Sequence, residues 1–224
     1  DINNPDQARS NFLIPNRFTM NVSWEHDWFE DFTTRISLFG EQYQTRPYSY
    51  VFASGGTVDT WGDNNEGLHL LYVPTGPTDP NVVFCSNTNA ADNTLCGGAA
   101  TNFDTTSFFA WADAVGLQRG AQTKRNSFEG GWNNKFDLKI EQEFPTGFGK
   151  GTAFLVVENL GNLLNDEWGV LYESPFPQRT AVVEVDRDVA TNRFIYRRLA
   201  QPNIDDAVDG VSFWTVKVGA TWGF

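Results

Sequence analysis

The 224-residue chain has only short apolar runs, two histidines and no excess of positive charge. Its aliphatic and aromatic runs, such as Ala153 to Val157, fall far short of the roughly 20 residues of a membrane-spanning helix. Lys and Arg number 16 against 28 Asp and Glu, a formal net charge of -12. Nucleic-acid-binding proteins present basic surfaces instead. The composition therefore argues against a transmembrane helix and against a nucleic-acid partner.

Residues that usually form catalytic or metal centres are scarce. His26 and His69 are the only histidines, and no nucleophile elbow, P-loop or zinc-type spacing occurs. We therefore expect no enzymatic activity and no cofactor. One loop segment could supply oxygen ligands to a calcium ion, although an ordinary polar turn in solvent is the commoner explanation: Asp59, Asp63, Asn65 and Glu66.

The chain also lacks a recognisable export signal, since it begins at Asp1 and its only methionine is Met20. We expect either a processed product or a piece of a longer protein. The two cysteines, Cys85 and Cys96, lie in a polar segment with ten residues between them. This spacing predicts a disulfide formed in an oxidising compartment, the alternative being two free thiols in a loop.

Aromatic residues are abundant, at 15% of the chain, which is unlike a disordered acidic protein. Many of them follow a period of two, typical of strands with one apolar and one wet face. We predict five strands, over residues 17–28, 32–46, 131–144, 151–164 and 214–224. Their length exceeds that of ordinary soluble strands and slightly exceeds the 9 to 11 residues of a tilted transmembrane strand.

The connections between these strands alternate in length. Residues 29–31 and 145–150 form short turns, whereas about 47–130 and 165–210 form long connections rich in turn-forming residues. Short turns at one end and long loops at the other are typical of outer-membrane barrels. Within the long connections, the sequence predicts a helix over 105–117 and a hairpin with cross-strand charge pairs over 182–196.

The two strand faces differ sharply in composition. One face has aromatics near the strand ends and aliphatics between them, and we assign it to lipid: Phe18, Met20, Val22, Trp24, Trp132, Phe136, Leu138, Ile140, Trp214, Val216, Val218 and Trp222. The opposite face is too charged for a sandwich core, and we assign it to a wet lumen: Glu25, Asp27, Lys135, Asp137, Lys139, Glu141 and Lys217. The competing interpretation is one sheet of a soluble protein.

Five strands cannot close a barrel, because bacterial single-chain barrels use even numbers from eight upward. We therefore expect residues 1–224 to be the C-terminal portion of one larger barrel domain. Alone, this portion would leave two unpaired strand edges.

The last strand resembles the C-terminal signal of outer-membrane barrels, with Lys217, Gly219, Trp222 and Phe224 at the matching positions. In that class, the strand is read by the barrel-assembly machinery. The alternative is an ordinary final strand that ends in phenylalanine.

Further segments resemble TonB-dependent receptors, and in particular their Oar-like branch. Residues 136–140 lead through a turn into Val157-Glu-Asn-Leu-Gly-Asn-Leu-Leu-Asn165, like the penultimate hairpin of that family, and residues 46–50, 70–74, 119–120 and 125–127 are similar to its Oar-like members. The resemblance implies the last five strands of a 22-strand barrel in the outer membrane of a Gram-negative bacterium, with extracellular long loops. The N-terminal plug and TonB box are not in this sequence.

Uptake of a scarce solute is the function that this resemblance implies. The implied partners are outer-membrane lipid and lipopolysaccharide, the assembly machinery, and TonB through the missing N-terminal region. Trp61, Tyr72 and Trp111 could contact a ligand, or simply pack within their loop. Two alternatives remain: a plug-less porin or structural and adhesive barrel, and a secreted β-sandwich that binds carbohydrate.

Overall fold

The computed structural model describes residues 7–28, 31–54, 69–86, 96, 102–147, 149–200, 202 and 206–222. The fold is mostly β, with 52% strand and 9% helix, and its sheets are open. The chain divides into two compact units. We call them the sheet unit (Ile14–Arg46, Gly130–Glu173 and Asp205–Phe224) and the loop unit (Asp1–Leu13, Pro47–Glu129 and Ser174–Ile204).

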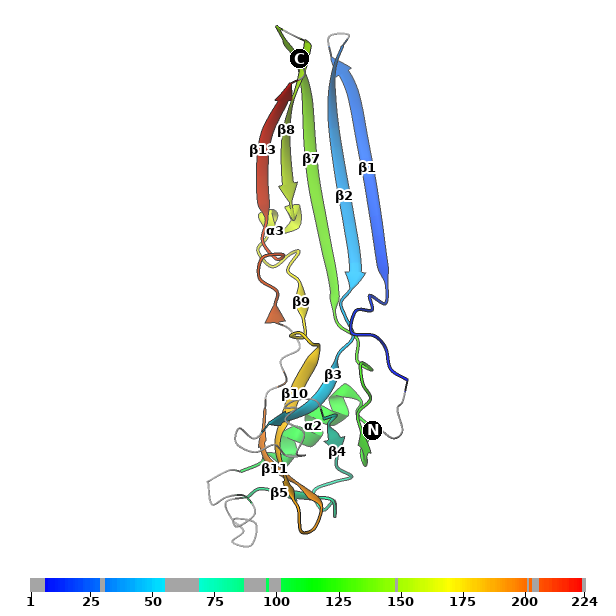
Figure 1. Ribbon diagram of the computed structural model, residues 1–224, viewed down its shortest axis with the longest axis vertical. Helices are drawn as coiled ribbons and strands as arrows, with labels where there is room; N and C mark the ends of the chain where they lie inside the picture. Colours follow the sequence, from blue (N-terminus) through cyan, green and yellow to red (C-terminus); the bar gives the residue numbers. More distant parts are fainter. Residues whose placement is uncertain are drawn as a thin grey trace. The chain divides into compact units, whose positions relative to one another are not determined.

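The sheet unit is built on one five-stranded antiparallel sheet, whose long strands run side by side in Figure 1. In spatial order, its strands are β1 (Arg17–Trp28), β2 (Phe32–Gln44), β7 (Trp132–Thr146), β8 (Gly149–Glu158) and β13 (Thr215–Trp222). Sequence neighbours in this set are therefore neighbours in space. All five predicted strands are confirmed, with four of them differing only at their ends.

The fourth predicted strand was too long at its C-terminal end. We expected it over 151–164, but β8 ends at Glu158 and residues Leu160–Leu164 form the short helix α3. Asn159 interrupts the strand because it adopts a left-handed conformation, with φ of 55°. Its backbone N–H turns to the Asp137 carboxylate, 2.8 Å away. A hydrogen bond to a side chain of the neighbouring strand β7 thus replaces the next bond of the strand ladder.

Segment 159–169 is held together by two buried asparagines. The Asn159 side-chain amide donates to the carbonyl of Gly169 at 3.0 Å. The Asn162 amide donates to the carbonyls of Asp166 and Trp168, at 2.9 and 3.0 Å. The asparagines that resemble a family motif in the sequence therefore have a structural role here, which is to pair backbone carbonyls where no strand partner exists.

Three glycines of the sheet lie directly opposite aromatic residues of the neighbouring strand. Gly40 pairs with Phe136, Gly151 with Phe144, and Gly219 with Phe154. In each pair, a β-carbon built on the glycine would lie within 3.0 Å of the ring. The rings therefore occupy the space that the glycines leave open, an arrangement that helps to fix strand register.

The loop unit contains a four-stranded mixed sheet, ordered β3 (Ser49–Ser54), β10 (Arg179–Asp188), β11 (Arg193–Leu199) and β5 (Val82–Phe84). Strands β10 and β11 are antiparallel, whereas β3 pairs with β10 and β5 with β11 in parallel. The loop unit also contains a short two-stranded ladder, formed by β4 (Tyr72–Val73) and β6 (Ala121–Gln122). A second short ladder, of β9 (Tyr172–Glu173) and β12 (Asp206–Ala207), belongs to the sheet unit.

The long connections thus form more than loops. They enclose a hydrophobic core rich in aromatic residues, whose fully buried members include Tyr50, Phe52, Phe108 and Tyr196. Periodicity could not reveal this sheet, because its parallel pairs join segments more than a hundred residues apart. Our expectation of irregular turns over most of these connections was therefore incomplete.

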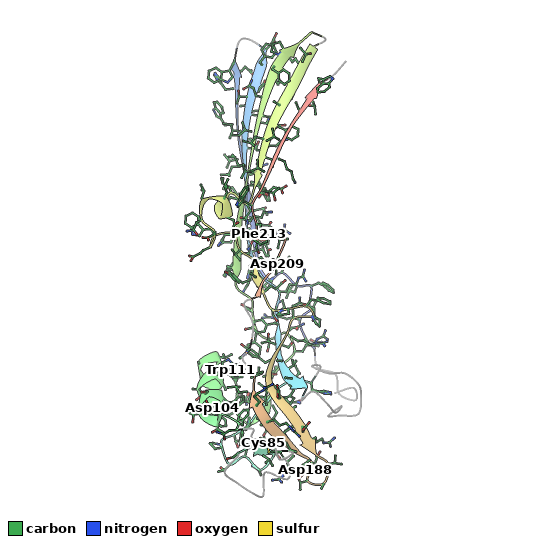
Figure 2. All side chains as sticks on the ribbon, turned by 90° about the vertical axis from the view of Figure 1, so that its left-hand side faces the viewer. Cys85, Asp104, Trp111, Asp188, Asp209 and Phe213 are labelled. Atoms are coloured by element: carbon green, nitrogen blue, oxygen red, sulfur yellow. A yellow bond between two sulfur atoms is a disulfide. The ribbon has the colours of Figure 1, made fainter. Side chains whose placement is uncertain are left out.

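The helix predicted over 105–117 is confirmed as α2 (Thr105–Val115). The Asp104 carboxylate caps its N-terminus by accepting from the backbone N–H of Ser107 at 2.9 Å, and Gly116 ends it with a left-handed φ of 77°. Figure 2 labels Asp104 and Trp111 at the cap and on the helix. Among the described residues, no helix is long and apolar enough to cross a membrane.

The predicted charged hairpin is confirmed and is longer than expected. Strands β10 and β11 pair antiparallel, and Glu184 lies opposite Arg198 with their side chains in an ion pair. Asp188 lies opposite Arg193, at 3.7 Å. Arg187, also in this segment, bonds to the Asn192 amide oxygen at 2.9 Å instead of to a carboxylate.

The disulfide between Cys85 and Cys96 is confirmed, with both residues buried beside Ile195. The backbone N–H of Cys85 donates to the Tyr196 carbonyl at 2.9 Å, and its carbonyl accepts from Phe103 at 2.8 Å. The disulfide therefore ties a long connection to strand β11.

Candidate functional site

The two faces of the five-stranded sheet separate apolar from charged residues as the sequence predicts. Register places aliphatic side chains of all five strands in continuous rows, because directly paired residues point to the same side. One row runs through Val22, Leu38, Leu138, Val157 and Val216, and the next through Trp24, Ile36, Ile140, Leu155 and Val218.

This apolar face is exposed over much of its area. Val22 is 55% exposed, Trp24 50% and Val218 78%. An exposed apolar surface of this extent is unusual for a water-soluble monomer and indicates an interaction surface. Side chains project from both sides of the sheet in Figure 2.

Aromatic residues flank the apolar rows at both strand ends. Near the short turns lie Trp28, Phe32, Phe144 and Trp222, of which Trp28 pairs with Phe32. At the other end, the rings of Phe18 and Trp132 stack with centroids 6.2 Å apart. The apolar face is therefore a band of aliphatic rows between two groups of aromatic rings.

The opposite face has a chain of ion pairs. The Arg35 guanidinium lies 2.7 Å from Glu25 and 3.9 Å from Glu141, and the Lys139 ammonium lies 2.8 Å from Glu141. Further ion pairs on this face are Arg17–Glu41, Lys135–Asp137, Lys150–Glu143 and Lys217–Glu158. Exposed pairs of this kind add little stability. They show instead that this face suits contact with water.

All seven charged positions that we assigned to a lumen lie on this second face, and the twelve assigned to lipid belong to the first face or, for Trp214, directly precede β13. Phe39 and Phe154 interrupt the charged face, since they pair with Asn21 and Glu141. Alternation thus predicted the side of each assigned residue that lies within the five strands. What each side contacts stays a prediction.

Tyr72 and Trp111, expected as ligand contacts, are used differently. The Trp111 ring packs in the core against Tyr50, with centroids 5.0 Å apart, which favours the packing alternative. Tyr72 stacks on Phe194 and lines a hollow of about 310 Å³ with Asn81, Arg187 and Asn192. Trp61, the third expected contact, lies outside the described residues, as does Phe224 of the assembly signal.

Asp79 organises the turn beside Tyr72, and the sequence analysis did not single it out. Its buried carboxylate accepts hydrogen bonds from Thr75 N–H at 2.7 Å, Thr75 hydroxyl at 3.0 Å, Asn81 N–H at 2.8 Å and Tyr72 hydroxyl at 3.1 Å. Burial alone would raise the pKa of Asp79, but these bonds outweigh it and hold the pKa below its ordinary value. The sequence pattern Thr-x-x-x-Asp-x-Asn, which residues 75–81 match, could have identified this turn.

No metal centre is visible in the described ranges, where no three His, Cys, Asp or Glu side chains are grouped to hold an ion. The four residues that we considered for calcium, Asp59, Asp63, Asn65 and Glu66, lie outside those ranges. That hypothesis therefore stays a prediction.

Comparison with models of protein families, with curated proteins and with solved structures found no match to this chain.

Proposed function

We propose that this chain forms the C-terminal five strands of an outer-membrane β-barrel that belongs to a TonB-dependent receptor. The observation that supports this best is the two-faced sheet: long antiparallel strands with an exposed apolar band on one side and linked ion pairs on the other. A barrel wall requires this combination, because lipid contacts one face and water the other.

The size of the apolar band fits a bilayer. Phe18 and Trp28 are ten positions apart in β1, which corresponds to about 33 Å along a strand. At the strand tilt of about 40° found in such barrels, this length spans about 25 Å of membrane thickness, close to the height of their apolar band. The aromatic rings at both ends match the two interfacial girdles.

The order of the strands supports the same proposal. Each strand pairs with its neighbour in sequence, and few residues separate β1 from β2 and β7 from β8. The long connections leave from the opposite ends of these strands, at Gln44 and Glu158. Up-and-down strands with short turns on one side and long loops on the other are the topology of outer-membrane barrels.

The receptor assignment depends on resemblance, in the last strand and in the segment from Val157 to Asn165. It implies that outer loops and lumen capture a scarce solute and that TonB drives rearrangement of a plug encoded upstream. Lumen side chains such as Arg35 and Lys139 would then offer polar contacts along the path. The folded loop unit supports a capture role, because a rigid core can present binding residues with little loss of entropy.

Two other functions are compatible with the same observations. A plug-less porin or structural barrel would have the same sheet, and a plug domain with a TonB box in the upstream gene would favour the receptor over it. A secreted carbohydrate-binding β-sandwich would instead cover the apolar face with a second sheet. Among the described residues of the sheet unit, no second sheet covers that face, whose Val22, Trp24 and Val218 stay exposed.

Membrane fractionation of the full-length protein tests the proposal. We expect the protein to sediment with the outer membrane and to resist extraction by sodium carbonate, dissolving only in detergent. It should also migrate faster on a denaturing gel when unboiled, as closed barrels do. Release by carbonate or high salt without detergent would contradict the barrel and favour the secreted sandwich.

A further inference from the structure

A small hollow in the loop unit is lined by two arginines and no acidic residue. Arg125 and Arg179 line it, in a space of about 140 Å³, together with Asn11, Ser49 and Asn126. Arg179 begins strand β10 and is the register partner of Ser49, the first residue of β3. The parallel pairing of β3 and β10 thus brings these separate segments to one place.

The two arginines differ from most other arginines of this unit, which form ion pairs: Arg9–Glu129, Arg119–Asp113, Arg193–Asp188, Arg197–Asp186 and Arg198–Glu184. Among the described residues, the Arg125 guanidinium makes one hydrogen bond, to the Asn11 amide oxygen at 3.2 Å. Across the part of the chain that the structure describes, Arg179 forms no hydrogen bond or ion pair. In a chain of net charge -12, two such cations in one hollow need a physical reason.

Holding these two charges together has an energetic cost. Burial, followed by the nearby Arg125 charge, lowers the pKa of the half-buried Arg179. A negative charge in the hollow would relieve both effects. Arg125 is exposed, so that an anion can reach the hollow from solvent.

The surrounding polar groups are rigidly placed. Asn126 is buried, and its backbone N–H donates to the Ser49 hydroxyl at 2.7 Å. Its side-chain amide donates to the Asn11 amide oxygen at 2.6 Å and to the Arg9 carbonyl at 2.7 Å. Asn126 thereby fixes the backbone beside Arg125 before any ligand arrives, which reduces the entropic cost of binding.

We propose that this hollow binds an oxyanion of the phosphate class, either free phosphate or the phosphoryl group of a larger solute. Two guanidinium groups present planar sets of N–H donors that match phosphate oxygens. Their combined charge of about +2 is balanced better by a phosphate group, whose charge at neutral pH is about -1.5 to -2, than by a carboxylate, which would leave one cation unbalanced. The proposal does not require the sheet unit to lie in a membrane.

Calorimetric titration of the full-length protein with inorganic phosphate, in a buffer that contains chloride, tests the site. We expect saturable binding, and a loss of at least about tenfold in affinity for Arg125→Gln and for Arg179→Gln, since a charge-assisted bond is removed. The affinity of Arg179→Lys for phosphate should lie between that of the native protein and that of Arg179→Gln, because lysine keeps the charge but not the planar set of guanidinium donors. Arg187→Gln is the matched control, as Arg187 also lacks a carboxylate partner among the described residues, and it should bind like the native protein.

Thermal unfolding separates binding from folding. Without phosphate, Arg179→Gln should keep or raise the midpoint, because the substitution removes an unpaired and repelled charge. Phosphate should raise the native midpoint but not that of the variant. Glucose 6-phosphate identifies the source: binding as tight as phosphate supports a phosphoryl group of a larger solute, and much weaker binding supports free phosphate.

Several results would overturn the site. They are no binding at millimolar phosphate, unchanged binding by the Arg125→Gln/Arg179→Gln variant, an equal loss in Arg187→Gln, or acetate binding as tightly as phosphate. None of these results depends on fractionation, so failure of this site and failure of the proposed function are distinguishable.

Discussion

Asp79 shows how one side chain determines a turn. Its carboxylate accepts four hydrogen bonds from Tyr72, Thr75 and Asn81, two of them from backbone N–H groups that have no strand partner. Tyr72 is thereby oriented, and its ring stacks on Phe194 with centroids 5.5 Å apart. The hollow beside Tyr72 therefore depends on a residue that does not itself line it.

Replacing this carboxylate should destabilise the loop unit and change its response to acid. We expect Asp79→Asn to lower the free energy of unfolding by about 1–3 kcal/mol at pH 7, because an amide leaves some buried donors unpaired. The folded-state pKa of Asp79 is depressed, so its stabilisation is present above the unfolded pKa of about 3.9 and is lost as pH falls through the folded value. Urea unfolding followed by near-ultraviolet circular dichroism between pH 2 and 7 measures both.

Asp113→Asn is the control for that experiment, since Asp113 is an exposed partner of Arg119 in the same unit. It should change stability much less. Equal effects of the two substitutions would show that the Asp79 network does not stabilise the turn.

At the scale of the element, alternation within each strand decides which side chains share a face. Ser23 and Val22 are neighbours in β1, yet Ser23 pairs with Ser37 on the charged face and Val22 with Leu38 on the apolar face. Both positions are exposed, so burial within this chain does not distinguish them. The two positions differ only in what their face of the sheet contacts.

A pair of arginine substitutions uses this difference. If the apolar face contacts lipid, Val22→Arg near the middle of β1 should cost about 2–4 kcal/mol and reduce the amount of folded protein in the outer membrane. Ser23→Arg, on the wet face, should behave almost like the native protein, because it loses only one exposed hydrogen bond. Protease resistance and gel mobility of the membrane fraction measure folding, and equal behaviour of both variants would contradict the lipid assignment.

At the scale of the whole molecule, the chain forms two units with different sources of stability. The loop unit has an aromatic core and contains the disulfide between Cys85 and Cys96. The sheet unit has strand ladders, and its apolar face stays exposed. Each unit should therefore respond differently to conditions that affect one source alone.

Reduction of the disulfide should loosen only the loop unit. We expect Cys85→Ser/Cys96→Ser to lower its stability by about 2–3 kcal/mol, the loss estimated for a closed loop of this length. Hydrogen exchange should then accelerate in β10 and β11 and remain unchanged in β2 and β7. Equal acceleration in both units would show that they unfold together.

The sequence alone determined the five long strands, the side to which each of their residues points, helix α2, the charged hairpin and the disulfide. These features depend on local chemistry: a period of two, an Asp cap with a closing glycine, and two cysteines close in sequence. The end of β8 was missed because the Asn159 backbone N–H donates to the Asp137 carboxylate of the neighbouring strand instead of making a ladder bond.

Only the tertiary structure decided how the long connections fold and which arginines meet. The parallel pairing of β3 with β10 joins residues about 130 positions apart, and periodicity within a short window contains no information on such a partner. Arg125 and Arg179 share a hollow for the same reason. Local patterns specify faces and ends of elements, whereas a site made of distant residues exists only once loop closure and core packing have brought them together.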